Sequence, residues 1–365
     1  MISSRTKNAT SRILPFGIIW FVSAIVYTLV ERGILGGLNY YPSTGNPYDF
    51  KSNLVITSVM ALIVGLFLGT VEVLYLSALF SKRSFIQKIL VKILIYFAMI
   101  VAFIFSLSVI ANAIQLNVSL THRMAWMNAW LFFSTFSFWG VGIFVAYGMT
   151  VTLFFAEVSG NLGAGVLNNF FVGKYHKPIE EERIFMFLDM KSSTTIAEAM
   201  GHVKYFEMLK EYFADLTEPI IDYGGEIYQY VGDEIVITWK VTKGTPLNNC
   251  VACFFAMKSK MKKLESKYIQ KFGLLPDFKA GIHTGGVTTG EIGVLKKEII
   301  FTGDVLNTTA RVQSLCNTYQ LDLLISGQLL KLLQLNSLPT IQAIGETELR
   351  GRDEKIMLYT FENIV

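Results

Sequence analysis

Four long apolar stretches in the first 160 residues constrain this chain more than any other feature. A segment of about 20 mainly apolar residues is long enough to cross a bilayer as a helix. The first stretch lacks a small-residue cleavage site and is followed by further spans, so it is not a removable signal peptide. We therefore expect residues 1–156 to form a transmembrane domain of about four helices, at roughly 14–30, 54–80, 93–114 and 129–155.

The composition changes near residue 170. Over the whole chain of 365 residues, 52% are hydrophobic and only 16% are charged, whereas soluble domains contain about 25% charged residues. Residues 174–365, however, are rich in Lys, Glu and Asp. This change predicts a soluble domain over residues 180–365, joined by a connecting helix or linker over residues 157–179. The net charge of +4 arises largely beside the apolar stretches, so we expect no nucleic-acid partner.

The basic residues predict how the spans are oriented. They gather before the first span, between the second and third, and after the fourth, while the other two loops contain few. By the positive-inside rule, the N-terminus and the soluble domain both face the cytoplasm. We therefore expect a multi-pass protein of the inner or plasma membrane. The residues that carry this prediction are Arg5, Lys7, Arg12, Lys82, Arg83, Lys88, Lys92, Lys174 and Lys177.

Glu72 lies well inside the second apolar stretch. A carboxylate at that depth is energetically costly and by default indicates a function. The alternatives are a structural hydrogen bond to a neighbouring helix and a position of Glu72 nearer the membrane interface. Cys250 and Cys253 are spaced as C-x-x-C within an amphipathic run, but no second pair or nearby His completes a zinc set. We expect them to be buried thiols on a helix.

The soluble half mixes strand and helix patterns. Residues 183–189 form an apolar run, and a Ser/Thr-rich turn and a helical pattern extending to Gly224 follow it. A hairpin is expected over residues 226–240, with its turn at Gly232 and Asp233. Helices are expected at about 248–272, 304–319 and 327–335, with short strands between and after them. The order predicts a mixed α/β sandwich with an antiparallel component.

Asp189 and Asp233 stand at the ends of two expected strands. Each alone is typical of a helix N-cap or a turn. Two carboxylates brought to one sheet edge would repel each other, and a divalent cation relieves that repulsion. Mg²⁺ binds through one or two carboxylates together with substrate phosphates. The turn that follows Asp189 opens a helix whose N–H groups form an anion site, and it contains Ser192, Ser193 and Thr194. This combination favours nucleoside triphosphate chemistry.

Asn307 and Arg311 are four residues apart on an expected helix and so share one face. A carboxamide and a guanidinium directed at one point suit a ribose and a phosphate that develops negative charge. Arg350, late in the chain, is a further candidate for a phosphate contact.

These motifs together resemble the catalytic domain of the class III nucleotidyl cyclases, the adenylyl and guanylyl cyclases, over residues 180–365. The resemblance implies a ferredoxin-like fold in which Asp189 and Asp233 bind two Mg²⁺ or Mn²⁺ ions. It implies that Asn307 orients the ribose, that Arg311 stabilises the transition state at phosphorus, and that Arg350 contacts the triphosphate. It also implies a homodimer with shared active sites, in which the ribose 3′-oxygen attacks the α-phosphorus and pyrophosphate is released.

The chain departs from the family at the two positions that select the base. These lie four residues before the second metal aspartate and seven before the asparagine, and here they hold Gln229 and Ile300. Gln can donate and accept hydrogen bonds, so it suits either purine. We favour ATP because it is the commonest substrate of the family. A guanylyl or pyrimidine cyclase, a non-catalytic nucleotide-binding receptor, and a transporter with an appended domain remain alternatives.

Overall fold

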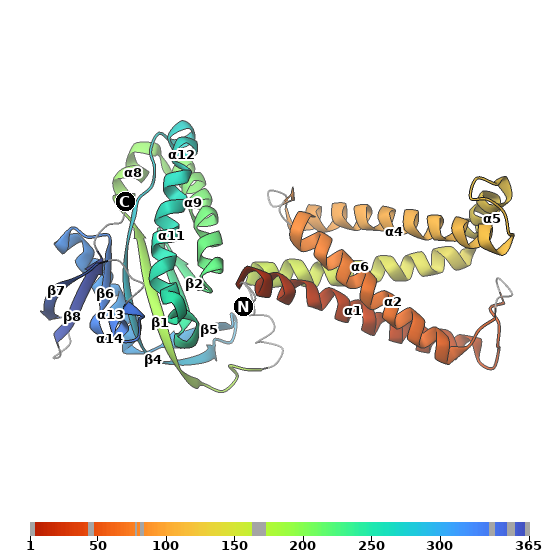
Figure 1. Ribbon diagram of the computed structural model, residues 1–365, viewed down its shortest axis with the longest axis horizontal. Helices are drawn as coiled ribbons and strands as arrows, with labels where there is room; N and C mark the ends of the chain where they lie inside the picture. The colour runs from red at the N-terminus through yellow and green to blue at the C-terminus, as the bar shows by residue number, and fades with distance from the viewer. Residues whose placement is uncertain are drawn as a thin grey trace. The chain divides into compact units, whose positions relative to one another are not determined.

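The computed structural model describes residues 4–42, 47–76, 79–80, 84–162, 173–335, 340–348 and 355–361. The chain divides into two compact units, Thr6–Leu162 and Gly163–Val365, drawn in Figure 1.

The first unit is helical. Four of its helices are long and apolar enough to cross a membrane, over Ala9–Leu35, Phe50–Leu76, Phe85–Ile114 and Phe138–Gly160. Close packing of the first two depends on Gly65, where an added Cβ would lie 2.8 Å from the carbonyl oxygen of Phe16. The elements are α1 (Ser4–Leu35), α2 (Phe50–Val71), the π-helical turn η1 (Glu72–Leu76), α4 (Phe85–Gln115), α5 (Arg123–Phe133) and α6 (Phe136–Leu162).

The expected bounds of the fourth span are wrong. The predicted range 129–155 crosses a break between α5 and α6, so the apolar helix begins later and extends further. Thr135 explains the break, because its hydroxyl accepts a hydrogen bond from the backbone N–H of Phe138 and caps the start of α6. The predicted connecting helix falls partly on residues 163–172, which lie outside the described residues.

The second unit is built on one mixed sheet with strand order β2-β3-β1-β4-β6-β8-β7, and β5 pairs separately with β4. The β4–β6 pair is parallel, and the other pairs are antiparallel. The predicted fold class, apolar helices followed by an α/β domain with a mixed sheet, is confirmed. The strands are β1 (Ile179–Met190), β2 (Glu226–Val231), β3 (Glu234–Lys240), β4 (Phe278–Ile292), β5 (Glu298–Thr302), β6 (Leu323–Ser326), β7 (Ile341–Glu348) and β8 (Lys355–Phe361).

Two of the expected helices are each divided. The first is interrupted at Gly201, whose φ of +80° a residue with a side chain adopts only with strain. The second bends at Leu264. Short strands are expected between the helices at 248–272 and 304–319, whereas much of this segment is the single long strand β4. The helices are α8 (Ser193–Met200), α9 (His202–Asp222), α10 (Val241–Gly244), η2 (Pro246–Asn248), α11 (Asn249–Lys263), α12 (Glu265–Phe272), α13 (Asp304–Tyr319) and α14 (Gly327–Leu330).

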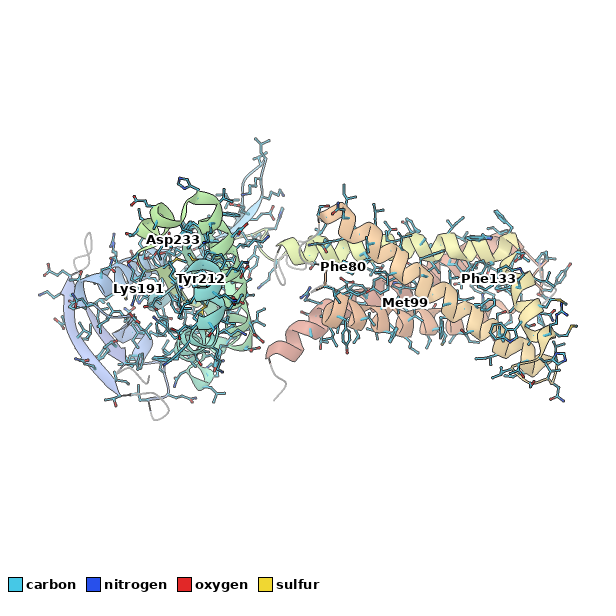
Figure 2. All side chains as sticks on the ribbon, turned by 90° about the horizontal axis from the view of Figure 1, so that it is seen from above. Phe80, Met99, Phe133, Lys191, Tyr212 and Asp233 are labelled. Atoms are coloured by element: carbon cyan, nitrogen blue, oxygen red, sulfur yellow. The ribbon has the colours of Figure 1, made fainter. Side chains whose placement is uncertain are left out.

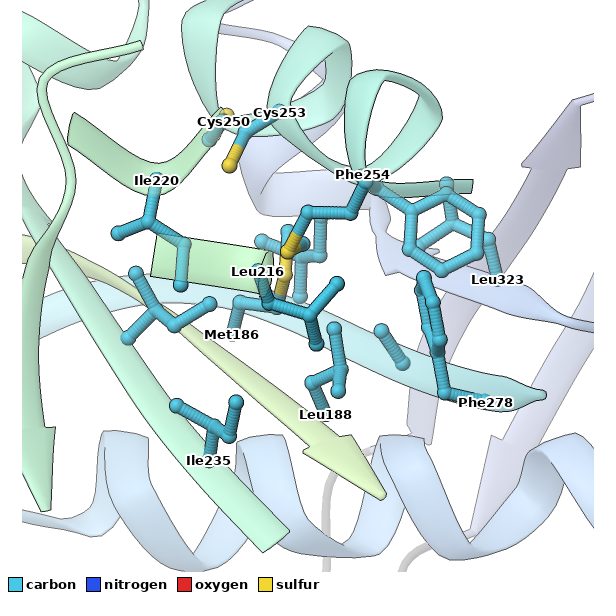
Figure 3. Packing of buried hydrophobic residues seen from close by; sticks show 14 of the residues in the cluster. Met186, Leu188, Leu216, Ile220, Ile235, Cys250, Cys253, Phe254, Phe278 and Leu323 are labelled. Atoms are coloured by element: carbon cyan, nitrogen blue, oxygen red, sulfur yellow. The ribbon is translucent and has the colours of Figure 1, made fainter. Parts of the chain in front are cut away.

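The main core lies between the sheet and α9, α11 and α12 (Figure 3). Because side chains alternate along a strand, Met186 and Leu188 of β1 face this core, whereas Phe187 faces α13. Cys250 and Cys253 on α11 are buried in the main core as expected, and burial raises the pKa of both thiols.

Helix α13 lies unusually close to the sheet. The reason is Gly281 on β4, where an added Cβ would meet the backbone nitrogen of Gln313 at 2.3 Å. Any larger residue would push α13 away. This approach brings the side chain of Gln313 to the end of β1, where the candidate site lies.

Candidate active site

Asp189 is next to last in β1 and lies on the sheet face that α13 covers. It pairs with Glu234 of β3 on one side and with Lys279 of β4 on the other. The Nζ of Lys279 lies 3.1 Å from Oδ2 of Asp189, and Nε2 of Gln313 donates to the same oxygen at 3.1 Å. Both contacts use Oδ2, so Oδ1 has no hydrogen bond to any described residue.

Asp233 occupies the two-residue turn between β2 and β3 (Figure 2). The turn is possible because Gly232 adopts a positive φ of +63°, which is typical of tight hairpin turns. Its charge acts on both neighbouring carboxyl groups: it raises the pKa of Asp189 and that of Glu234. The structure therefore brings the two predicted metal aspartates together, with Glu234 as a third carboxyl group.

This carboxyl cluster is electrostatically strained. Burial, followed by the charges of Asp189 and Asp233, raises the pKa of Glu234 to about 7. Burial is also the largest cause of the raised pKa of Asp189; Lys279 opposes it, and Asp233 adds to it. Among the described residues, no three His, Cys, Asp or Glu side chains are arranged to enclose a metal ion. The donor set nevertheless fits Mg²⁺, which needs only one or two carboxylates when substrate phosphates supply the remaining oxygens.

The predicted phosphate turn follows directly. Ser192 adopts a left-handed conformation, with φ of +56°, and its side chain makes no capping hydrogen bond to α8. Ser193 opens α8 and interacts with the hydroxyl of Tyr205. Ser192 and Thr194 are exposed. The uncapped N–H groups at the start of α8 are thus accessible beside the carboxyl cluster, as an anion site requires.

Asn307 and Arg311 lie on α13 but point away from Asp189. At about 100° per residue, they are separated by only about 40° and so share a face, whereas each lies about 120° or more from Gln313. Gln313 is buried against Asp189, while Asn307 is exposed and Arg311 is half-buried. Neither the Asn307 nor the Arg311 side chain has a hydrogen bond or ion pair within the described part of the chain. One chain therefore does not bring this pair to its own aspartates.

The two expected base-selecting residues lie on different strands. Gln229 is exposed on the edge strand β2, just after a register shift that sets Tyr228 outside the ladder as a β-bulge. Ile300 is half-buried on β5. Arg350 falls outside the described residues, so its predicted phosphate contact stays a prediction.

Glu72 is buried in the first unit and is fully paired. Its Oε1 lies 2.5 Å from Nζ of Lys92, and its Oε2 accepts a hydrogen bond from Tyr96 at 2.9 Å. Glu157 of α6 extends the network to Lys88 at 2.9 Å and to Lys92 at 3.8 Å. Lys88 and Lys92, expected in a loop, lie within α4. The network borders a cavity of about 250 Å³.

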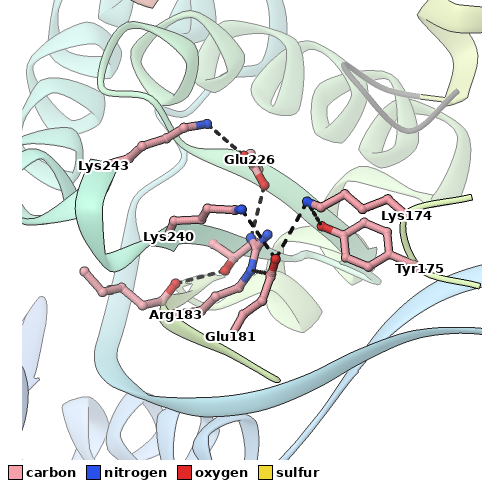
Figure 4. Close-up of polar contacts among 9 residues, drawn as sticks. Lys174, Tyr175, Glu181, Arg183, Glu226, Lys240 and Lys243 are labelled. Atoms are coloured by element: carbon pink, nitrogen blue, oxygen red, sulfur yellow. Dashed lines mark hydrogen bonds and ion pairs between the residues drawn. The ribbon is translucent and has the colours of Figure 1, made fainter. Parts of the chain in front are cut away.

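Sequence reasoning missed several residues that shape the site. Lys279 and Gln313 hold Asp189, and Arg183 is buried in an ion cluster with Glu181 and Glu226 (Figure 4). A signal existed for Lys279, because it is a charged residue among apolar neighbours at the start of the strand (FKAGI). Such a residue is seldom buried unless it is paired.

Sequence comparison matches residues 175–363, just over half of the chain, to the adenylate and guanylate cyclase catalytic domain. The chain belongs to this family. Among curated cyclases, Adenylate cyclase 2 of Rhizobium meliloti (strain 1021) is 36% identical over 204 residues, which cover 56% of each protein. Adenylate cyclase 1 of the same organism is 27% identical over 51% of this chain and 28% of its own length. The match with this chain therefore covers only part of the length of these two cyclases.

A solved structure shows the same fold. A bacterial light-regulated adenylyl cyclase superposes with a TM-score of 0.53 at 22% identity, over 62% of this chain and 66% of its own. At this identity the likeness concerns the fold alone.

Proposed function

We propose that this protein is a membrane-bound nucleotidyl cyclase that converts ATP into 3′,5′-cyclic AMP and pyrophosphate. The observation that carries the proposal is the cluster of Asp189, Asp233 and Glu234 beside the uncapped start of α8, in a chain of the cyclase family. Clustered carboxylates next to a helix N-terminus suit a metal–triphosphate complex. The named adenylate cyclases among the relatives favour ATP.

Each residue then has a role. Asp189 and Asp233 would hold two Mg²⁺ or Mn²⁺ ions, with Oδ1 of Asp189 not hydrogen-bonded to any of the described residues. Bound there, such ions lower the pKa of the attacking hydroxyl and neutralise the leaving group. Lys279 and Gln313 fix the Asp189 carboxylate through Oδ2. The N–H groups of the turn over Ser192, Ser193 and Thr194 would bind phosphate oxygens, and Arg350 is proposed as a further phosphate contact.

Asn307 would orient the ribose and Arg311 would stabilise the charge that develops at phosphorus. The 3′-oxygen would form a bond to the α-phosphorus while its proton passes to a phosphate oxygen of the substrate, and the bond from the α-phosphorus to the oxygen bridging to the β-phosphate would break, with pyrophosphate as the leaving group. Gln229 and Ile300 would contact the base. Because Gln229 can hydrogen-bond to adenine or guanine, GTP is an alternative substrate. The assay below therefore tests GTP, and it tests the pyrimidine triphosphates as well.

We propose that the active enzyme is a homodimer with shared sites. Asn307 and Arg311 point away from the aspartates of their own chain, so a second copy is needed to bring the two sets together. Exposed apolar side chains offer a surface for that copy: Val203 and Phe206 on α9 are 78% and 68% exposed, and Val231 on β2 is 52% exposed. Burying such side chains against an identical surface is favourable.

The four apolar helices would anchor the enzyme in the inner or plasma membrane, with its N-terminus and catalytic domain in the cytoplasm. We propose that Glu72 is functional there, because π-helical turns often mark functional sites and its network joins η1, α4 and α6.

The deciding experiment supplies purified full-length protein with ATP, GTP, CTP and UTP in turn, each with Mn²⁺ or Mg²⁺. We expect cyclic AMP as the main product. Gln229→Lys should change the ratio of ATP to GTP turnover, whereas Gln342→Lys, an exposed glutamine on edge strand β7, should not. If no nucleotide gives a cyclic product, the cyclase proposal is wrong and a non-catalytic nucleotide-binding receptor becomes the favoured function.

A further inference from the structure

Arg183 on β1 is a buried cation to which the proposed mechanism gives no role. Its side chain is only 2% exposed. Nε donates to Glu181 at 2.8 Å, and Nη1 donates to Glu226, the first residue of β2, at 3.1 Å (Figure 4). A buried guanidinium needs such partners, because an unpaired charge in this position would be strongly destabilising.

The guanidinium of Arg183 also contacts β5. It lies over the ring of Phe301, 4.6 Å from the ring centroid, in a cation–π arrangement. Phe301 packs edge-on against Tyr228 of β2 with 4.8 Å between centroids, and its backbone N–H donates to the Tyr228 hydroxyl at 3.4 Å. We call Glu181, Arg183, Glu226, Tyr228 and Phe301 the Arg183 cluster.

The Arg183 cluster joins two strands that the sheet itself does not join. In the order of hydrogen-bonded strands, β3, β1 and β4 lie between β2 and β5. Along a flat sheet, four steps of about 4.8 Å would separate β2 from β5 by about 19 Å. The direct ring contact between Tyr228 and Phe301 therefore comes from side-chain packing across the curled face of the sheet, and no backbone ladder sets it.

The residues next to this contact are the expected base-selecting pair. Gln229 follows Tyr228, and Ile300 precedes Phe301. The bulge at Tyr228 loosens the pairing of β2 just before Gln229. Gln229 and Ile300 therefore each lie next to a residue of the Arg183 cluster, and their two strands are not paired with each other by backbone hydrogen bonds.

We propose that Arg183 is a positioning residue for base selection, which sets the placement of Gln229 relative to Ile300 by holding Glu226 of β2 and Phe301 of β5. The inference rests on the proposed function to the extent that Gln229 and Ile300 contact the base. Arg183 itself touches no substrate, and changes to its cluster should alter discrimination between bases while phosphate binding is preserved.

The variants are chosen to keep the fold. Arg183→Lys retains the charge but loses the planar fork and the ring stacking. Phe301→Leu retains apolar volume but loses the ring. Two matched controls disturb equivalent contacts elsewhere in the domain. Lys267→Gln breaks ion pairs with Glu211 and Asp215, and Phe254→Leu removes a ring that packs on Phe278.

The test measures equilibrium binding of 3′-deoxy-ATP and 3′-deoxy-GTP, with Mg²⁺, to full-length protein. These nucleotides lack the attacking hydroxyl, so binding is observed without turnover. Wild type should prefer one base by tenfold or more. Arg183→Lys and Phe301→Leu should each reduce that preference about fivefold, in keeping with the loss of a buried cation–π contact. Affinity for pyrophosphate should stay within twofold of wild type, and both controls should keep the wild-type preference.

Several results would overturn the positioning role: an unchanged preference in Arg183→Lys and Phe301→Leu, an equal loss of preference in the controls, or no preference in wild type. The same proteins are also assayed for cyclic product, which tests the proposed cyclase activity separately. If the 3′-deoxy nucleotides bind with the expected pattern but ATP and GTP give no cyclic product, the positioning role is supported and the cyclase activity is refuted.

Discussion

At the scale of single residues, the three carboxyl groups of the site differ in which charged and hydrogen-bonding groups lie next to them. Asp189 has Lys279 and Gln313 on one oxygen, whereas Glu234 has carboxylates as its nearest charges and carries a pKa raised to about 7. Burial and mutual repulsion act in the same direction on Glu234. Asp233 is half-buried in the turn between β2 and β3, next to the exposed Gly232. This asymmetry supports the proposal that Asp189 and Asp233 bind metal, with Glu234 as their neighbour.

Asp233→Ala should reduce turnover about a thousandfold or more, because it removes a ligand worth several kcal/mol of transition-state charge stabilisation. The residue lies in a turn, so the thermal unfolding midpoint should stay close to that of wild type. Steady-state turnover with Mn²⁺ and thermal unfolding measure the two effects. Asp222→Ala, at the exposed end of α9, serves as the control and should retain full activity. Near-normal turnover in Asp233→Ala would rule out its metal role.

At the scale of elements, an ion network fastens the loops around the site. Lys191 follows β1, Asp277 precedes β4, and Asp322 precedes β6, and Lys258 reaches them from α11. Lys191 lies 2.7 Å from Asp277, Lys258 lies 2.7 Å from Asp322, and both lysines contact both aspartates. Lys191 immediately precedes the phosphate turn, so this network holds the turn to the end of the sheet.

The network predicts a defined pH dependence of stability. Burial opposes ionisation of Asp277, but Lys191 and Lys258 outweigh it and lower its pKa below the unfolded value of 3.8. Its stabilisation is therefore complete above pH 3.8 and is lost as pH falls through the lowered pKa. Asp277→Asn should cost about 1 kcal/mol or less at pH 7, because the pairs are partly exposed.

Thermal unfolding from pH 7 to pH 3 tests this. The difference in midpoint between wild type and Asp277→Asn should shrink once the pH drops below 3.8, and Asp222→Asn should show no such difference. A gap that is constant across this range would mean that the ion pairs of Asp277 do not stabilise the fold.

The buried pair of Glu72 and Lys92 belongs to the same scale, since it joins η1 to α4. Glu72→Leu should lower stability by about 3 kcal/mol, because among the described residues Lys92 then keeps only the longer ion pair with Glu157, at 3.8 Å. The double variant Glu72→Leu/Lys92→Met should recover most of that loss. If Glu72 is functional, the double variant should nevertheless change the cyclase rate at least threefold. Thermal unfolding and turnover are measured in the same detergent. If the double variant recovers both wild-type stability and the wild-type cyclase rate, the pair is purely structural.

At the scale of the whole molecule, the proposed active site needs two chains. Gln313 ties one face of α13 to Asp189, which leaves Asn307 and Arg311 on another face. A symmetric pair of chains would combine each set with its complement and produce two equivalent sites. The membrane helices would then also influence catalysis through the pairing of the two chains.

Complementation tests the shared site. Asp189→Ala and Arg311→Ala should each be inactive alone. When the two are co-expressed, random pairing makes half of the dimers mixed, and each mixed dimer has one intact site. The mixture should therefore show roughly a quarter of wild-type turnover. Co-expression of the Asp189→Ala chain with the Asp233→Ala chain serves as the control. Both substitutions remove a proposed metal ligand, so every site in a mixed dimer lacks one. A mixture no more active than its components would place each complete site within one chain.

The sequence by itself determined what depends on local pattern. Apolar length predicted four helices long enough to cross a membrane, and three of them lie about where expected. The placement of Asp189 and Asp233 at strand ends, and the shared face of Asn307 and Arg311, also follow from the periodicity of one strand or helix. These features require only neighbours in sequence, so spacing was enough to predict them.

Only the tertiary structure decided the partners. Glu72 meets Lys92 from another helix, Lys279 pairs with Asp189 from the neighbouring strand, and Arg183 contacts Phe301 more than a hundred residues later. Spacing cannot predict such pairs, because their distance depends on strand register, on sheet curl and on the close approach that Gly281 allows. Gln229 shows the difference: the sequence placed it on a strand beside a turn, and the fold placed its strand against β5 through the Arg183 cluster.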